Sequence, residues 1–164
     1  MIRVMFVLLG LALALVAGYC GYRMLASDET RIRWLLQDAA VSFNNMNLRG
    51  CVGAFDQDYR EKTTGLGLLE LKNALRVSFL QRVDPKTKAF LYRIRVPEQG
   101  ISVKVGDNGE QAEAQFTLYL EGRQHGAFET QWQIAVTAEL HKADNGDWRI
   151  HSSSHETLDG QRPR

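Results

Sequence analysis

The chain has 164 residues, of which 45% are hydrophobic, and its 20 Lys and Arg nearly balance 19 Asp and Glu. This length suits one domain of ordinary size and a short extra segment. Near-neutral charge, without a basic stripe interleaved with aromatic residues, argues against nucleic-acid binding. The two cysteines, Cys20 and Cys51, provide no disulfide within the domain if Cys20 lies in a membrane.

The extra segment is N-terminal, where Val4 to Tyr22 include no charged residue. As a helix it extends about 28 Å, close to the ~30 Å hydrocarbon core of a bilayer. We expect residues 1–26 to be either an uncleaved anchor or a secretory signal with a cleavage site near Val16-Ala17-Gly18. An anchor places the domain at the inner or plasma membrane, with the domain exported. A cleaved signal makes it secreted or periplasmic.

Three amphipathic helices are expected next. Ser27 followed by two acidic residues is typical of a helix start and predicts a helix over residues 28–46. Asn47 can cap a short second helix, whose apolar side is formed by Cys51, Val52, Phe55 and Tyr59. The apolar side of the third helix is formed by Leu68, Leu71, Ala74, Leu75 and Phe79. Each face follows the helical period.

The second half of the chain alternates with a period of two, which predicts strands with one buried face. The strands expected are 90–96, 101–105, 111–121, 127–142 and one from Trp148 towards Leu158. Hairpin turns are indicated at Gly106–Gly109 and Asn145-Gly146. Residues 128–140 would span about 43 Å if flat, so this strand must curl, through a bulge. The concave face can then take the helices.

This order of elements is similar to that of the nuclear transport factor 2-like superfamily, which includes ketosteroid isomerase and scytalone dehydratase. The resemblance rests on residues 28–36, on Ala54–Tyr59, on the helix start at Gly67–Leu71 and on the ending Asn145–Ile150. It implies an α+β fold over residues 27–158, with three helices on the concave face of a strongly curved antiparallel sheet, a half-cone. Residues 159–164 are expected to be a flexible tail. The superfamily is functionally mixed, so the fold does not decide the function.

Candidate catalytic residues are few. Asp58 as a base and Tyr59 as a hydrogen-bond donor form a weak acid–base candidate, because ketosteroid isomerase uses such a combination. The other interpretation makes Tyr59 a core residue and Asp58 a solvated one. Neither that enzyme's motif nor the His and Asp dyad of scytalone dehydratase occurs here, so no catalytic residue is carried over.

Strand alternation indicates which side chains line a pocket on the concave side. If Trp148 and Ile150 face inward, Ser152, Ser154 and Glu156 do so too, unless a bulge intervenes. The other interpretation is that this strand leaves the core and becomes solvated. The full set of pocket candidates is Tyr59, Tyr92, Thr130, Trp132, Ser152, Ser154 and Glu156, of which Glu156 is also a weak catalytic candidate.

The histidines indicate no metal site. His151 and His155 are expected to face outward, and four residues along a strand separate them by about 13 Å. His125 lies in a predicted turn and His141 near a strand end. We therefore expect no metal ion and no cofactor.

The leading functional hypothesis is a membrane-tethered, non-enzymatic domain that binds a protein partner or a small apolar ligand. The alternative is a small-molecule isomerase or dehydratase-like lyase with acid–base residues in the pocket. A homodimer through the outer sheet face is also considered, because that face is polar but little charged in its middle. The residues there are Gln115, Thr117, Tyr119, Gln131, Gln133 and Thr137.

Overall fold

The computed structural model describes residues 26–124 and 126–161. The predicted anchor or signal segment, Val4–Tyr22, lies outside the described residues. Within them, no helix is both long enough and apolar enough to cross a membrane.

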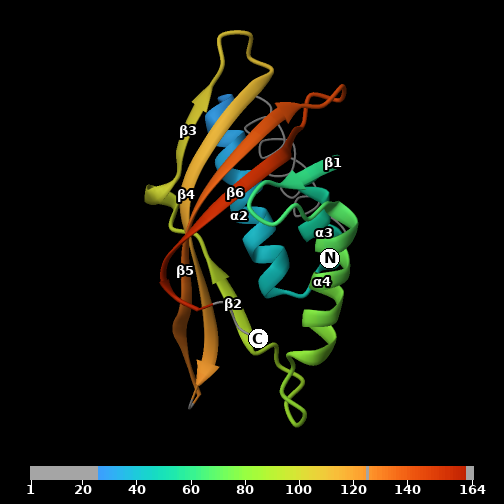
Figure 1. Cartoon of the computed structure of the whole chain (residues 1–164), viewed down its shortest axis with the longest axis vertical. Helices are drawn as coiled ribbons and strands as arrows, with labels where there is room; N and C mark the ends of the chain where they lie inside the picture. The colour runs from blue at the N-terminus through green and yellow to red at the C-terminus, as the bar shows by residue number, and fades with distance from the viewer. Residues whose placement is uncertain (1–25, 125, 162–164) are drawn as a thin grey trace, which may run out of the picture.

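A curved six-stranded sheet is covered on one face by helices, which confirms the expected α+β architecture (Figure 1). The helices are α2 (Asp28–Asn44), α3 (Leu48–Gly53), α4 (Leu68–Gln81) and the 3-10 turn η1 (Glu98–Gly100). The strands are β1 (Phe55–Glu61), β2 (Tyr92–Arg95), β3 (Ser102–Val105), β4 (Gln111–Gln124), β5 (Ala127–Lys142) and β6 (Trp148–Gly160). Their order is β1-β6-β5-β4-β2, and β3 also pairs with β4.

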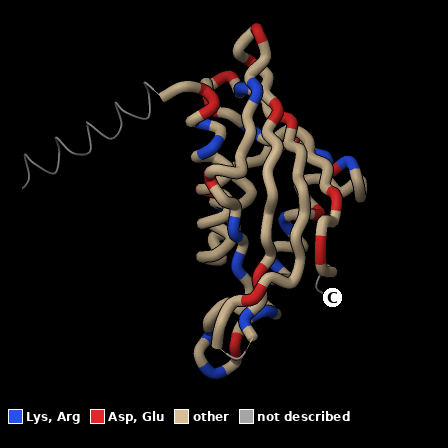
Figure 2. Tube along the Cα trace, turned by 90° about the vertical axis from the view of Figure 1, so that its left-hand side faces the viewer, with Lys and Arg blue, Asp and Glu red and all other residues tan. Residues whose placement is uncertain are grey.

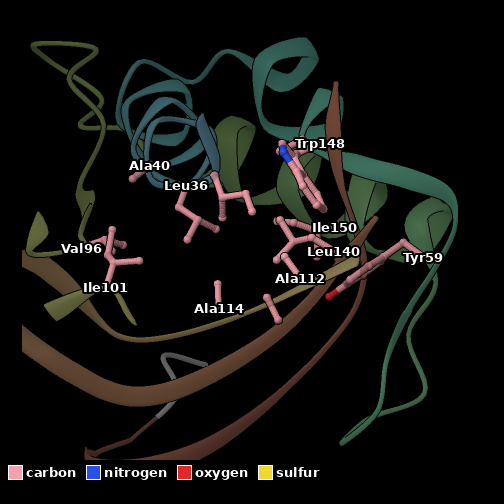
Figure 3. Packing of buried hydrophobic residues seen from close by; sticks show 13 residues of the cluster. Leu36, Ala40, Tyr59, Val96, Ile101, Ala112, Ala114, Leu140, Trp148 and Ile150 are labelled. Carbon is pink, nitrogen blue, oxygen red and sulfur yellow. The ribbon is translucent and has the colours of Figure 1, made fainter. Parts of the chain in front are cut away.

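The first helix matches its prediction closely. Ser27 caps α2, because its Oγ accepts a hydrogen bond from the Thr30 amide at 3.3 Å. Ile32, Leu36 and Ala40 are buried, at the spacing of four that keeps them on one helix face. They pack against the concave side of the sheet (Figure 3).

The second helix is shorter than expected, and the sheet is mixed rather than antiparallel throughout. Helix α3 ends at Gly53, and the following residues form β1, which pairs in parallel with β6. The Ile150 amide donates to the Ala54 carbonyl, and the Lys62 amide donates to the Ser153 carbonyl. A spacing of four, as between Phe55 and Tyr59, puts side chains on one face of a helix and of a strand alike. The apolar pattern therefore did not distinguish the two structures.

Both predicted hairpin turns are present. Gly109 has φ of 67° in the turn between β3 and β4, and Gly146 has φ of 81° between β5 and β6. Glycine adopts such positive values readily because it has no Cβ. The last strand continues through Asp159 and Gly160, which we expected to belong to the tail.

Bulges interrupt the long strands, as the length of β5 predicted. In β6, Ile150 opposes Leu140, but Ser152 opposes Glu139, so His151 is an extra residue without an opposite partner. A second extra residue in β6 is Leu158, and Gln131 is an extra residue in β5. Each bulge bends its strand and reverses the facing of the residues beyond it.

The Gln131 bulge changes the facing of Phe128. Strict alternation would put Phe128 on the same face as Trp132, but it lies on the outer face, with the Arg93 guanidinium 4.6 Å from its ring centre. Arg93 also donates to Glu121, which Arg95 contacts as well, at 2.8 Å. The two guanidiniums offset the free-energy cost of burying this charged carboxylate. Burial would raise the pKa of Glu121, but the hydrogen bonds and positive charges of Arg95 and Arg93 hold it below its usual range.

Asp28 attaches the start of α2 to the end of the sheet. Its two carboxylate oxygens accept hydrogen bonds from Trp148 Nε1 at 3.0 Å and from Lys142 Nζ at 2.9 Å. Burial alone would raise the pKa of Asp28, but the hydrogen bonds from Lys142 and Trp148 outweigh it, and the pKa is lowered. The ionised carboxylate therefore stabilises the packing of α2 on β5 and β6.

We predict that Asp28→Ala lowers the free energy of unfolding by about 1–3 kcal/mol, the usual range for a lost charged hydrogen bond. Because the folded pKa lies below the ordinary value, this contribution is complete above pH 3.8 and is lost as the pH falls through the folded pKa. Urea unfolding at several pH values measures both effects. Glu29→Ala is the matched control, since Glu29 lies in the same first turn and is exposed. An equal loss in both variants would assign the effect to the helix dipole.

Candidate functional site

A cavity of about 300 Å³ lies between the helices and the concave face of the sheet. Its wall is almost entirely aliphatic and aromatic. Helices α2 and α4 supply one side and strands β2, β4, β5 and β6 the other, with Leu36, Ala39, Phe43, Leu71, Leu75, Ile94, Phe116, Leu118, Ile134, Val136, Ala138 and Ile150 among the lining residues. Because these side chains are apolar, the cavity favours apolar surface over water.

The polar side chains of the cavity come from two neighbouring strands, β1 and β6. They are Tyr59, Ser153 and His155. The Tyr59 hydroxyl lies 2.7 Å from Ser153 Oγ, and Tyr59 is only 5% exposed. Burial is the main cause that raises the pKa of Tyr59, and the negative charge of Glu61 adds to it. The phenol therefore stays protonated and can donate a hydrogen bond.

His155 is paired with Glu61, whose carboxylate is fixed by the turn that follows β1. His155 Nδ1 lies 3.1 Å from Glu61 Oε1, and Glu61 also accepts from the Thr63 and Thr64 amides and from the Thr64 hydroxyl. Burial opposes ionisation of Glu61, but these hydrogen bonds prevail and lower its pKa to about 2. A carboxylate at Nδ1 favours the tautomer that leaves Nε2 as the unprotonated nitrogen. This is the arrangement by which an acid orients a histidine base.

Cys51 lines the same cavity without being a nucleophile at neutral pH. Burial raises the pKa of its thiol to about 11, so the reactive thiolate is scarce. The thiol acts as a small apolar group of the wall.

The His151 bulge corrects the predicted lining from β6. Beyond the bulge, Ser153 opposes the buried Ala138, whereas Ser152 opposes Glu139 on the outer face and donates to its carboxylate at 2.6 Å. Ser154 and Glu156 therefore face outward, and His155, expected outward, lines the cavity. The length of the strands indicates a bulge, but no residue pattern in β6 indicates its position.

The remaining candidates lie outside the cavity lining, apart from Tyr59. Asp58 and Thr130 are exposed, and Tyr92 packs on Phe90 with ring centres 6.1 Å apart. Trp132 donates from Nε1 to Thr157 Oγ1, and its ring is nearly perpendicular to that of His155. Asp58 and Glu156 therefore do not line the cavity with Tyr59.

A second group of polar side chains was also missed. Asp56, His141 and His151, from three strands, lie together on the outer side of the sheet, with the two imidazole centres 5.5 Å apart. The histidines look scattered when only their spacing along one strand is considered. The contact depends on the register between strands, which the spacing of histidines along one strand does not show.

Comparison with known proteins identifies the fold. No family model matches the chain, and no curated protein matches it. A nuclear transport factor 2-like protein with a cystatin-like fold from Novosphingobium aromaticivorans matches with a TM-score of 0.63 and 15% identity, over 88% of this chain and 91% of that one. A function-unknown protein from Mycobacterium tuberculosis matches with a TM-score of 0.64 and 17% identity, over 79% and 76%. A ketosteroid isomerase-like protein from Erwinia carotovora atroseptica matches with a TM-score of 0.55 and 13% identity, over 82% and 99%. The chain therefore has the nuclear transport factor 2-like fold, and identities this low show the fold alone.

The Glu61 carboxylate gives a prediction for the site's stability. Because its pKa falls from 4.5 to about 2 in the folded protein, its contribution is present above pH 4.5 and is lost as the pH falls towards 2. We predict that Glu61→Gln lowers the free energy of unfolding at pH 7 by about 2 kcal/mol, by weakening charged hydrogen bonds. It should also reduce the loss of unfolding free energy between pH 4.5 and 2. Glu156→Gln, an exposed position on β6, is the control and should change neither quantity.

Proposed function

We propose that this protein binds a small, mostly apolar ligand in the cavity between α2, α4 and the sheet, without catalysing a reaction. One observation carries the proposal: a 300 Å³ cavity with an apolar wall whose polar groups come from β1 and β6 alone. Burial of apolar ligand surface in such a cavity contributes about 25 cal/mol per Å².

The size and polarity of the cavity restrict the ligand. Its volume is at the lower end of the range for small-molecule pockets, roughly 300–1,000 Å³. The Tyr59 hydroxyl, the Ser153 hydroxyl and the His155 imidazole can hold one oxygen function of the ligand. The class proposed is therefore a compact hydrocarbon ring or short chain with a single carbonyl or hydroxyl group.

The tether is the second part of the proposal. Val4 to Tyr22 would hold the domain at a membrane, with the domain on the exported side, and a cleaved signal is the alternative. Ligands of the proposed class partition into lipid, so a binding domain beside the bilayer would meet them at high local concentration. Assembly through the outer sheet face remains compatible with this arrangement, since the charged residues of the long strands gather towards their ends (Figure 2).

Filling the cavity tests ligand binding directly. We predict that cyclohexanone, an apolar ring with one acceptor, shifts the NMR signals of the Ile134 and Ile150 methyl groups in the full-length chain held in a mild detergent. Ala39→Phe places a ring in the cavity and should abolish these shifts. The control, Val41→Phe, lies on the same helix but is 53% exposed and should leave them unchanged. Partition of the probe into micelles affects both variants equally. Equal shifts in both variants would exclude the cavity as the binding site.

A second candidate function, an acid–base isomerase or lyase, is favoured by the Glu61–His155 pair. His155 Nε2 would remove a proton next to a carbonyl, while Tyr59 donates a hydrogen bond to the carbonyl oxygen. Both side chains line the same cavity.

Deuterium exchange separates the two functions. The binding proposal predicts that the protein incorporates no deuterium next to the cyclohexanone carbonyl beyond the rate in buffer. Faster incorporation that is lost in His155→Gln but retained in His141→Gln would establish the enzyme instead. His141→Gln is the matched control, because His141 lies on the outer side of the sheet, away from the cavity lining.

A further inference from the structure

The outer side of the sheet holds a group of metal-binding side chains that the ligand cavity does not use. Asp56 comes from β1, His141 from β5 and His151 from β6. His151 is the extra residue of the β6 bulge, and its imidazole lies beside that of His141. Three adjacent strands thus bring one carboxylate and two imidazoles together, the residue types that bind zinc and neighbouring transition metals.

The distances between the donor atoms fit a metal ion. Bonds of about 2.0–2.2 Å to zinc, at tetrahedral angles, place neighbouring donor atoms roughly 3.3–3.6 Å apart. Asp56 Oδ2 lies 3.2 Å from His141 Nε2 and 3.6 Å from His151 Nδ1. All three donor atoms lie within 4.8 Å of one another. The three donor atoms are therefore close enough together to be ligands of one ion.

The surroundings favour a cation and leave room beside it. The three side chains line a cleft of about 630 Å³. Its walls also include Glu113, Glu139 and Lys104. Glu139 is already paired with Lys62 at 2.6 Å, so the carboxylates of Asp56 and Glu113 face the one remaining ammonium group of the lining, that of Lys104. Three protein ligands with an open side are the arrangement found in catalytic rather than structural zinc sites.

We propose that Asp56, His141 and His151 bind one first-row transition-metal ion, with Zn²⁺ as the fitting ion, and that its fourth coordination position opens into this cleft. The site is separate from the ligand cavity, which lies on the opposite face of the sheet. It does not rest on the proposed ligand binding. Without an ion, the same contacts amount to a carboxylate paired with two imidazoles, and the test must distinguish these two states.

Zn²⁺ titration of the full-length chain, without a histidine tag and after treatment with a chelator, provides the test. Calorimetry should show one ion per chain. Asp56→Asn, His141→Gln and His151→Gln should each weaken binding at least tenfold. His155→Gln is the matched control: it removes a histidine from the same strand but from the inner face, and the affinity should stay unchanged. No heat of binding, or equal losses in His155→Gln and His151→Gln, would overturn the proposal.

Replacing one metal-binding side chain by another distinguishes a lost ligand from a misfolded variant. His151→Cys supplies a thiolate, another zinc and cobalt ligand, at the same position. With Co²⁺ as the probe, this variant should retain one ion per chain and gain a thiolate-to-metal charge-transfer band that the parent protein lacks. Co²⁺ bound without that band, or lost altogether in a variant that melts as a folded protein, would contradict the assignment of His151 as a ligand.

Discussion

The extra residue that β6 carries at His151 sets the facing of every side chain between it and the next bulge. Before the bulge, Ile150 faces the core with Leu140; after it, Ser153 faces the core with Ala138. A strand's side chains alternate strictly, so one inserted residue exchanges the two faces. The polar part of the cavity depends on this exchange, because it brings Ser153 and His155 to the inner face. His151 itself faces the other side, where it lies beside Asp56 and His141.

The cavity exists because the curved sheet and the helices touch only along part of their surfaces. Ile32, Leu36 and Ala40 of α2 pack closely on the small residues Ala112, Ala114 and Ala138, and Asp28 fixes the start of that helix. Helix α4 has no fully buried residue and contributes only the part-buried side of Leu71 and Leu75 to the cavity. Such a helix is loosely packed, so the α4 side of the cavity is the less stable part of its wall.

Hydrophobic periodicity in the sequence predicted much of the fold, but it did not predict the two candidate sites. Helix α2, the bounds of β5 and the presence of a bulge were predictable, because long regular patterns and an excessive strand length leave little choice. Strand β1 was mistaken for helix because a spacing of four suits both structures. The facing of Ser152 to Glu156 depended on where the bulge falls, and the contact of His141 with His151 depended on pairing between strands. Tyr59 was a pocket candidate because it is both apolar and able to form hydrogen bonds, and it lines the cavity.

The facing of β6 after the bulge is tested most directly by nuclear Overhauser effects in the labelled full-length chain. The structure predicts contacts between the Tyr59 ring and the β-protons of Ser153, together with contacts between the His141 and His151 rings. Contacts from Tyr59 to Ser152 or Ser154 instead would mean that β6 alternates without interruption. Ser153 and His155 would then face away from the cavity, and Ser152 and Ser154 would take their places.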